Sequence, residues 1–576
     1  MLFLRRLFLC GLSLIAAVAT RAAQPVNAPL FGLEEIKPGQ IGEVWTVFQG
    51  TKAEPFQVTV AGIVRNALGP GKSLILCRMS DPRVQKMGAV AGMSGSPMYI
   101  DGRLAGALSY QILSFETEHF AGFTPSADLA EVGSRTDLPA SAEPAPAAAV
   151  NRAYAPLRPS FVLSGLSPEV AALMEPSFRA AGLGAVALGG STTGGTASTA
   201  PATLAPGDAV SVALATGDIT LAGTGTVSEM NGNRMVAFGH PMMSLGDVEL
   251  PMCSAEIVTI IPSALESIKV ANTGGIIGTV TQDRLSAVSG TLGRMPELID
   301  VTVSVKSEHP RELHFQVVRQ AELSPTIIAS GVSQAVMGSN DAGLNHGFRI
   351  NTDIAFTGHQ SLTSNVLYSG PQAFASGVSD FVRGLSQDLL NPYEKTFPQH
   401  VQFTVEALAE NPAVVLNLFQ LSRRSAQVGD VVQAQLGWRD YQGNEHTQTV
   451  DIPISPDWAG RTLEVVLVPG PVLDQLTGHP AQIAPAQLRS FSAYLEAMKD
   501  IHPSDGLFLA VVEQAPVFTD QTDVVPELPG SFARPAAAAD ESRFQTHPAL
   551  FPLWESHVLA GKLAPVALRR PLKITD

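Results

Sequence analysis

The feature that most constrains this 576-residue chain is a glycine-rich turn that leads directly into a β-hairpin. The turn reads Gly-Met-Ser-Gly-Ser-Pro over residues 92–97. Two short apolar runs follow, at 98–100 and 104–108, and Asp101-Gly102 joins them. An Asp-Gly pair accepts the positive φ angles of a tight hairpin turn, so the spacing predicts two antiparallel strands. Ser94 is therefore expected on a turn that leads into a strand.

A serine held between glycines in this way is a candidate nucleophile. The nucleophile elbow Gly-x-Ser-x-Gly needs a helix after the serine. Here Pro97 and a hairpin follow, and Ser96 stands in place of the second glycine. The arrangement favours a β-barrel protease of the chymotrypsin type, in which backbone N–H groups hold the oxyanion. We expect the N–H groups of Gly92 and Ser94 to be those donors. The alternative is a β-turn without chemistry, because short motifs often occur by chance.

Composition limits the class of protein. The formal net charge is −15, which argues against nucleic acid as a partner. Hydrophobic residues make up 45% of the chain and charged residues 15%, and there are 51 glycines and 42 prolines. This mixture predicts a mainly β protein with many turns.

The N-terminus has the pattern of a secretory signal. Arg5 and Arg6 precede an apolar stretch over 7–19, and small residues follow. The stretch is shorter than the roughly 20 residues that span a bilayer. We therefore predict a signal peptide over residues 1–23 and a secreted, periplasmic or cell-envelope location. An uncleaved anchor is the alternative.

The cysteines do not form a disulfide framework. Cys10 would leave with the signal peptide, and Cys77 and Cys253 remain. They can pair in an oxidising compartment, but burial as small apolar residues is the default expectation.

The chain divides into segments of different composition. Residues 24–137 read as the first part of a peptidase and 207–395 as the second, with Ala/Pro-rich and Gly-rich linkers over 138–206. An amphipathic helix is expected before Pro392, and a short one within 167–182. Residues 396–520 alternate in the manner of a small β-sandwich, with a helix at about 485–499. The tail, 521–576, is expected to be irregular.

A serine nucleophile needs a base, and histidine is the usual one. Among the 12 histidines, His240 stands out because it follows the apolar run 236–239 and precedes Pro241. A turn histidine without chemistry is the alternative. For the orienting carboxylate, Asp81 lies 13 residues before Ser94, although Asp-Pro also initiates turns. Asp247 is a weaker rival.

Patterns that bind metals or cofactors are absent from the sequence. There is no His-Glu-x-x-His, no Cys-x-x-Cys, no EF-hand loop, no P-loop and no dinucleotide fingerprint. We expect neither a metal nor a cofactor.

Several stretches together resemble the stage IV sporulation protein B serine peptidases. Residues 74–82, 88–98 and 101–107 resemble the nucleophile segment of that family, and 223–240 resembles its histidine segment. Residues 256–258 and 272–278 fit the part that follows. The resemblance implies Ser94 as nucleophile, His240 as general base and Asp81 as third member, in a chymotrypsin-like fold. Family members are secreted or surface-acting endopeptidases, and the sporulation members cleave a membrane-associated regulator.

The order of the two segments departs from the family. In the sporulation proteins the histidine segment comes first, whereas here His240 follows Ser94 by 146 residues. This order resembles a circular permutation, which is tolerated where termini lie close together at the surface. The spacing from Asp81 to Ser94 is also slightly shorter than in the family. The sporulation members carry a PDZ domain as well, and none is recognisable in this sequence.

Taken together, the sequence predicts a secreted serine endopeptidase that acts through an acyl-enzyme on Ser94. The expected fold is a circularly permuted chymotrypsin-like double β-barrel with a C-terminal β-sandwich-like domain. Its partner is expected to be a protein or peptide substrate, with a membrane-associated protein as one candidate. Two alternatives stay open, namely a non-catalytic cell-envelope binding or scaffold protein on a degenerate protease fold and a self-processing protein cut in the 189–206 loop.

Overall fold

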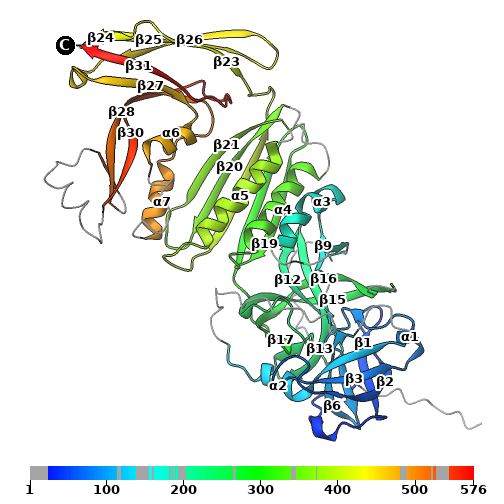
Figure 1. Ribbon diagram of the computed structural model, residues 1–576. Coiled ribbons are helices and arrows are strands. Elements are labelled where there is room, and N and C mark those ends of the chain that lie inside the picture. The colour runs from blue at the N-terminus through cyan, green and yellow to red at the C-terminus, as the bar shows by residue number, and fades with distance from the viewer. Residues whose placement is uncertain are drawn as a thin grey trace, which may run out of the picture.

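The computed structural model shows an elongated molecule with two β-barrels at one end and a β-sandwich at the other (Figure 1). It describes residues 24–575 apart from gaps at 113–117, 138–154, 158–160, 181–182, 184–185, 189, 192–202, 264–266, 339–345, 371–372, 480–489, 521–522 and 527–543. The predicted signal peptide, most of the first linker and most of the 189–206 loop lie outside these residues. Within them, no helix is both long enough and apolar enough to cross a membrane.

The first barrel is a closed ring of antiparallel strands. The ring runs β5-β1-β2-β3-β7-β6 and closes because β5 also pairs with β6. Its strands are β1 (Ile41–Val47), β2 (Ala53–Val64), β3 (Leu74–Met79), β5 (Pro97–Ile100), β6 (Arg103–Gln111) and β7 (Phe120–Pro125). A short strand, β8 (Ala155–Pro156), adds to the outer side of β6.

The hairpin after the serine turn forms as predicted. Ile100 faces Arg103 across β5 and β6, and Asp101 and Gly102 make the turn between them. Their φ angles are +50° and +73°, as a tight hairpin turn requires. The strands around this hairpin enclose an apolar core that includes Phe56, Phe123 and Met98.

The second barrel is also a closed antiparallel ring. It runs β13-β14-β17-β16-β15-β12 and closes through the pairing of β12 with β13. Its strands are β12 (Ala209–Gly217), β13 (Thr220–Asn231), β14 (Arg234–Ala237), β15 (Gly246–Ile261), β16 (Ser267–Arg284) and β17 (Ala287–Leu292). Four short strands extend this sheet: β4 (Val90–Ala91), β9 (Phe161–Ser164), β10 (Val186–Leu188) and β11 (Gly190–Ser191). The two rings confirm the mainly β class and the double barrel.

An α/β layer follows the second barrel and continues its sheet. Strand β12 pairs with β19, and the order proceeds through β18, β22, β20 and β21. These strands are β18 (Leu298–Lys306), β19 (Arg311–Val318), β20 (Gly347–Phe356), β21 (Leu362–Ser369) and β22 (Pro398–Ala407). Helices α4 (Ser324–Met337) and α5 (Ala373–Leu389) cover the sheet, and α3 (Pro168–Ala180) packs on α4 (Figure 1). The sheet thus passes the boundary predicted at residue 396, while α3 and α5 form where helices were expected.

The C-terminal domain has two sheets around one apolar core, as the sandwich prediction requires. The smaller sheet contains β23 (Val415–Leu421), β25 (Val431–Arg439) and β26 (Glu445–Pro453). The larger contains β24 (Ser425–Gln427), β27 (Thr462–Val468), β28 (Leu507–Asp520), β29 (Asp523–Pro526), β30 (Phe544–Val558) and β31 (Leu568–Thr575). Helix α6 (Gly470–Thr477) packs on β28 and β30. Helix α7 (Phe491–Lys499) lies against the α/β layer, where the Phe491 and Phe356 rings are 5.1 Å apart.

The tail after residue 520 differs from the irregular segment we expected. It supplies β30, which pairs along β28, and β31, which pairs with β27 in the middle of the larger sheet. Leu572 and Ile574 of β31 are buried in the sandwich core. The alternation of β31 is masked in the sequence because Arg570 shares the inward face with Leu572 and Ile574, where its guanidinium lies over the Phe419 ring at 5.2 Å. Arg569 and Lys573 are exposed on the outward face.

Candidate active site

The serine turn lies at the seam between the two barrels. It follows β4, which pairs with β16 of the second barrel, and it precedes β5 of the first. The Thr226 N–H donates to the carbonyl of Ser94 at 2.8 Å, and the Thr226 hydroxyl donates to the carbonyl of Gly92 at 3.1 Å. The Ser228 hydroxyl donates to the carbonyl of Gly95 at 2.8 Å. Strand β13 therefore fixes the backbone on both sides of the candidate nucleophile.

Gly95 is required by this seam. Its φ angle is +94°, a region that favours glycine, and a Cβ there would lie 2.0 Å from the Thr226 carbonyl oxygen. The same Cβ would lie 2.4 Å from the backbone nitrogen of Phe238. The N–H groups of Gly95 and Ser96 are already bonded to the carbonyls of Leu108 and Met93, at 2.7 and 3.0 Å. The roles of the Gly92 and Ser94 N–H groups as oxyanion donors stay predictions.

The side chain of Ser94 is buried, and its hydroxyl makes no hydrogen bond to any described residue. The residue is 0% exposed, and its Oγ has no hydrogen-bond partner in the part of the chain that the structure describes. Burying a hydroxyl without a partner costs free energy, so native proteins rarely tolerate it. Orphaned polar atoms of this kind are typical of sites where a substrate or a rearrangement supplies the missing partner.

His240 lies on the same seam but is not bonded to Ser94. It follows β14 and two residues with positive φ, Phe238 and Gly239. The ring is buried, with Nε2 at 2.9 Å from the Leu157 carbonyl oxygen and Nδ1 at 2.8 Å from that of Pro241. A neutral imidazole has one N–H and satisfies only one of these carbonyls, whereas a protonated ring satisfies both. Phe238, two residues before His240, packs against the serine turn at Gly95. The Nε2 of His240 itself faces the Leu157 carbonyl, and the role of His240 as base stays a prediction.

The two carboxylates named from the sequence are engaged elsewhere. Asp81 caps α1 (Pro82–Gln85), where its Oδ1 accepts the Arg83 N–H at 2.8 Å. Its Oδ2 pairs with the Arg83 guanidinium at 3.0 Å, and this hydrogen bond holds the pKa of Asp81 below its usual range. These contacts are those of the Asp-Pro turn that was the alternative reading. Asp247 pairs with Arg284 at 2.7 Å.

Asp283 is a residue that the sequence analysis missed. It is buried on β16, and its carboxylate accepts the N–H groups of Met242, Met243 and Leu245 at 2.7, 2.8 and 3.1 Å. These bonds fix the loop that directly follows His240. Burial raises the pKa of Asp283, and the backbone N–H groups oppose that rise. No local pattern marks it in the sequence, because its neighbours on β16, Gln282 and Arg284, are polar as well.

Lys269 is a second buried residue that the sequence did not mark. Its stem lies against Gly92, where an added Cβ would be 3.0 Å from the Lys269 Cβ. Its Nζ donates to the Thr46 hydroxyl at 2.7 Å. Burial lowers its pKa to about 7. An amine that can lose its proton near neutral pH thus lies on the strand that pairs with the approach to the serine turn.

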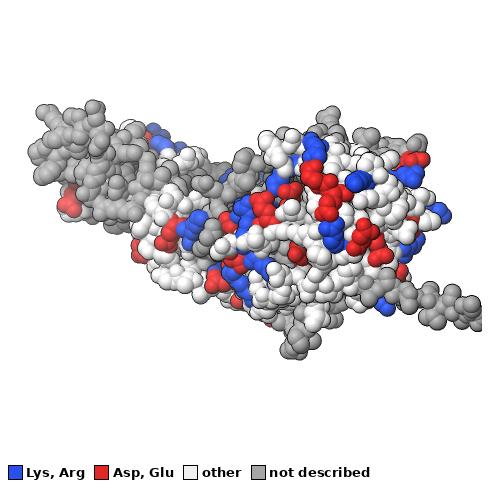
Figure 2. Space-filling model, turned by 90° about the horizontal axis from the view of Figure 1, so that it is seen from below, with Lys and Arg blue, Asp and Glu red and all other residues white. Residues whose placement is uncertain are grey.

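Cys77 and Cys253 are free and buried, and burial raises the pKa of the Cys253 thiol to about 12. Among the described residues no group of three His, Cys, Asp or Glu side chains could hold a metal ion. Lys and Arg side chains are interspersed with Asp and Glu on the face that Figure 2 shows.

One family model matches the part of the chain that contains the first barrel. Residues 16–123 match the model of the family described as SpoIVB peptidase S55. The match contains the serine turn and confirms the resemblance seen in the sequence, and it supports a peptidase. It ends before His240, so the permuted order stays a prediction. No curated protein and no solved structure matches the chain.

Proposed function

We propose that the protein is a serine endopeptidase whose nucleophile is Ser94. The observation that carries the proposal is the buried, partnerless Oγ of Ser94 inside a segment that matches a serine peptidase family. The double barrel supports it, because barrel proteases of this type place nucleophile and base on facing sides of a barrel interface.

The chemistry would be acyl transfer. The Ser94 Oγ attacks the peptide carbonyl carbon while its proton passes to His240, and the Gly92 and Ser94 N–H groups hold the oxyanion. The tetrahedral intermediate then expels the amine, which takes the proton from His240. Water repeats the sequence on the acyl-enzyme, so one peptide bond is hydrolysed and Ser94 is restored.

The proposal requires one rearrangement at His240. Its Nε2 faces the Leu157 carbonyl, so this contact must break before the ring can accept a proton from Ser94. Leu157 follows β8, the short strand at the outer edge of the first barrel. The described conformation therefore corresponds to a resting state of the proposed enzyme.

The substrate would be a protein or peptide outside the cytoplasm. This part rests on the signal-like N-terminus, and on the resemblance to peptidases that act on a membrane-associated protein. Cleavage of the chain itself is a narrower version of the same activity.

Labelling with a fluorophosphonate serine probe tests the nucleophile. We expect the wild-type protein to be labelled and Ser94→Ala to be unlabelled. Ser80→Ala, which removes another hydroxyl of the first barrel, should label as the wild type does. His240→Gln should slow labelling by about a thousandfold or more, the order of loss for a missing base. Labelling that persists in Ser94→Ala would refute the assignment.

The same buried geometry favours one competing function. A binding or scaffold protein on a protease fold would also keep Ser94 covered and the His240 ring bonded to carbonyls. Such a protein would fold normally, and the fluorophosphonate probe would never label it.

Self-cleavage has its own test, which compares the purified wild type with Ser94→Ala by mass spectrometry. Identical fragment patterns in the two proteins would eliminate self-cleavage.

A further inference from the structure

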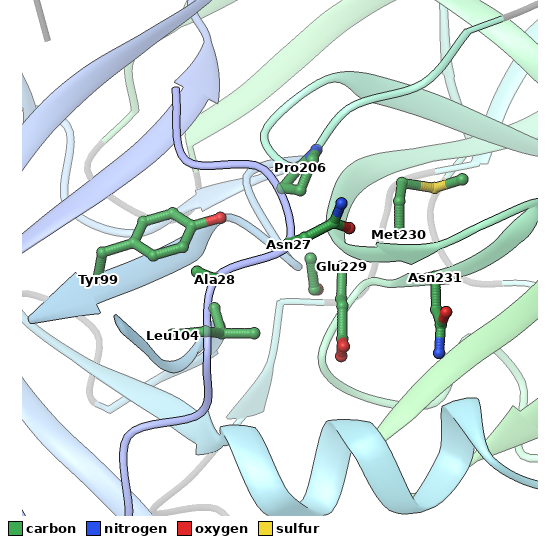
Figure 3. Close-up of a pocket in the computed structure, with 9 residues that line it drawn as sticks. Asn27, Ala28, Tyr99, Leu104, Pro206, Glu229, Met230 and Asn231 are labelled. Atoms are coloured by element: carbon green, nitrogen blue, oxygen red, sulfur yellow. The ribbon is translucent and has the colours of Figure 1, made fainter. Parts of the chain in front are cut away.

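A small polar pocket lies beside the serine turn, on the side of β13 and β5 (Figure 3). Its volume is about 280 Å³. The walls come from the segment at Asn27 and Ala28, from the hairpin of the first barrel, and from the end of β13. The lining residues are Asn27, Ala28, Tyr99, Leu104, Pro206, Ser228, Glu229, Met230 and Asn231.

The pocket contains an acidic group whose charge is not compensated. The Oε2 of Glu229 is buried and has no hydrogen-bond partner among the described residues. No lysine or arginine lines the pocket, so nothing in its wall neutralises this carboxylate. Burial raises the pKa of Glu229. Burial first, and then the charge of Glu229, raise the pKa of Tyr99. A buried carboxylate without a cation is costly, and a ligand that brings a positive charge would remove that cost.

The pocket is joined to the serine turn through a single residue. Ser228 lines the pocket and donates its hydroxyl to the carbonyl of Gly95, the residue after Ser94. Glu229 is the next residue along β13, and Tyr99 follows the turn on β5. The pocket and the serine turn therefore share the Ser228 side chain.

We propose that this pocket selects a lysine or arginine side chain of the substrate, with Glu229 as the residue that determines specificity. The inference rests on the proposed peptidase function. Leu104 and Met230 supply apolar surface for the methylene stem of such a side chain, and its charged end would meet Glu229. Asn27 and Asn231 add polar groups to the wall of the pocket (Figure 3). The Tyr99 hydroxyl, also in the wall, donates to the Pro25 carbonyl at 3.3 Å. Neither an acidic nor a purely apolar side chain would satisfy the Glu229 carboxylate.

Binding to an inactive protein tests the pocket without any catalysis. The probe is Nα-acetyl-arginine methylamide, titrated into Ser94→Ala and followed by NMR. We expect saturable binding that weakens about tenfold or more when Glu229→Gln is added, as for a lost hydrogen bond to a charged group. Adding Glu256→Gln instead changes an exposed glutamate of β15 and should leave the affinity unchanged. Equal affinity in the Glu229→Gln and Glu256→Gln proteins would overturn the proposal.

A cleavage experiment tests separately whether Glu229 sets the preference for a cationic side chain. Matched peptides that carry arginine or the uncharged norleucine are offered to the wild type and to Glu229→Gln. We expect the preference for arginine to fall about tenfold or more in Glu229→Gln. Fluorophosphonate labelling of both proteins reports separately whether Ser94 reacts. Labelling with an unaltered preference would overturn the pocket and leave the peptidase intact. Absence of labelling would overturn the peptidase, and the binding experiment would still decide whether the pocket takes a cation.

Discussion

At the scale of single residues, the buried Lys269 leads us to predict that the free energy of unfolding depends on pH. Its pKa is about 7 in the folded protein against an ordinary value of 10.5. Between these values the unfolded chain binds more protons than the folded one, so stability should rise as the pH increases from about 7 to 10.5. Below about 7 both states are protonated and the full cost of burial remains. Each unit of pKa difference corresponds to about 1.4 kcal/mol.

Urea denaturation across this pH range measures the effect. Lys269→Met should flatten the rise in stability and should make the protein more stable than the wild type near pH 7. Lys37→Met removes an exposed lysine and should retain the wild-type slope. If the slope of stability against pH were the same in Lys269→Met as in the wild type, the lowered pKa of Lys269 would be contradicted.

Some residues of the candidate site could be predicted from the sequence, and others could not. Ser94 was predictable because its glycines and the following hairpin are local in sequence. Asp81 was ambiguous for the same reason, since an Asp-Pro turn and a catalytic carboxylate share one local pattern. Lys269, Asp283 and Glu229 were not predictable, because their properties come from burial by strands that are distant in the chain.

At the scale of elements, the short strand β8 leads into Leu157, whose carbonyl oxygen lies 2.9 Å from the Nε2 of His240. The Leu157 side chain is buried in the core of the first barrel and so holds its carbonyl against the imidazole. Leu157→Ala removes this anchor, at the usual cost of about 2–5 kcal/mol for such a truncation. We expect Ser94 to react faster with a fluorophosphonate in this variant, because the freed Nε2 can then accept a proton.

A matched core truncation provides the control. Ile75→Ala removes a fully buried side chain from the same core without touching β8. It should lower stability to a similar extent and leave the labelling rate of the folded protein unchanged. Equal labelling rates in the two variants would mean that Leu157 does not restrain His240.

The elements also show which patterns of sequence are informative. The hairpin of β5 and β6 and the helix α5 were predictable, because a two-residue turn and a helical apolar spacing are both complete within one segment. Strands β30 and β31 were not, because prolines and charged residues interrupt their alternation. Their place in the larger sheet depends on β27 and β28, which complete the pairing.

At the scale of the whole molecule, the sandwich has a core separate from that of the barrels. Leu572 belongs to the sandwich core, whereas Phe491 of α7 belongs to the core shared by the second barrel and the α/β layer. Leu572→Ala should therefore destabilise the sandwich alone and leave fluorophosphonate labelling of Ser94 unchanged. Phe491→Ala should destabilise the α/β layer, at about 3–5 kcal/mol for a buried phenylalanine.

Calorimetry combined with labelling at increasing temperature separates the two variants. In Leu572→Ala, labelling should persist beyond the first heat-absorption peak, which reports the sandwich. In Phe491→Ala, labelling should be lost at a lower temperature than in the wild type. Loss of labelling together with the sandwich transition in Leu572→Ala would show that the molecule unfolds as one unit.

The seam at the serine turn has a consequence for the order of events during synthesis. The Thr226 hydroxyl that holds Gly92 lies 134 residues later in the chain, and the Ser228 hydroxyl that holds Gly95 lies 133 residues later. When the ribosome has just completed the first barrel, neither contact exists. A newly made chain therefore lacks these two contacts at the serine turn until its second barrel has been translated and docked. In a peptidase of the proposed kind, such a delay would keep the serine turn incomplete while the rest of the chain is still being made.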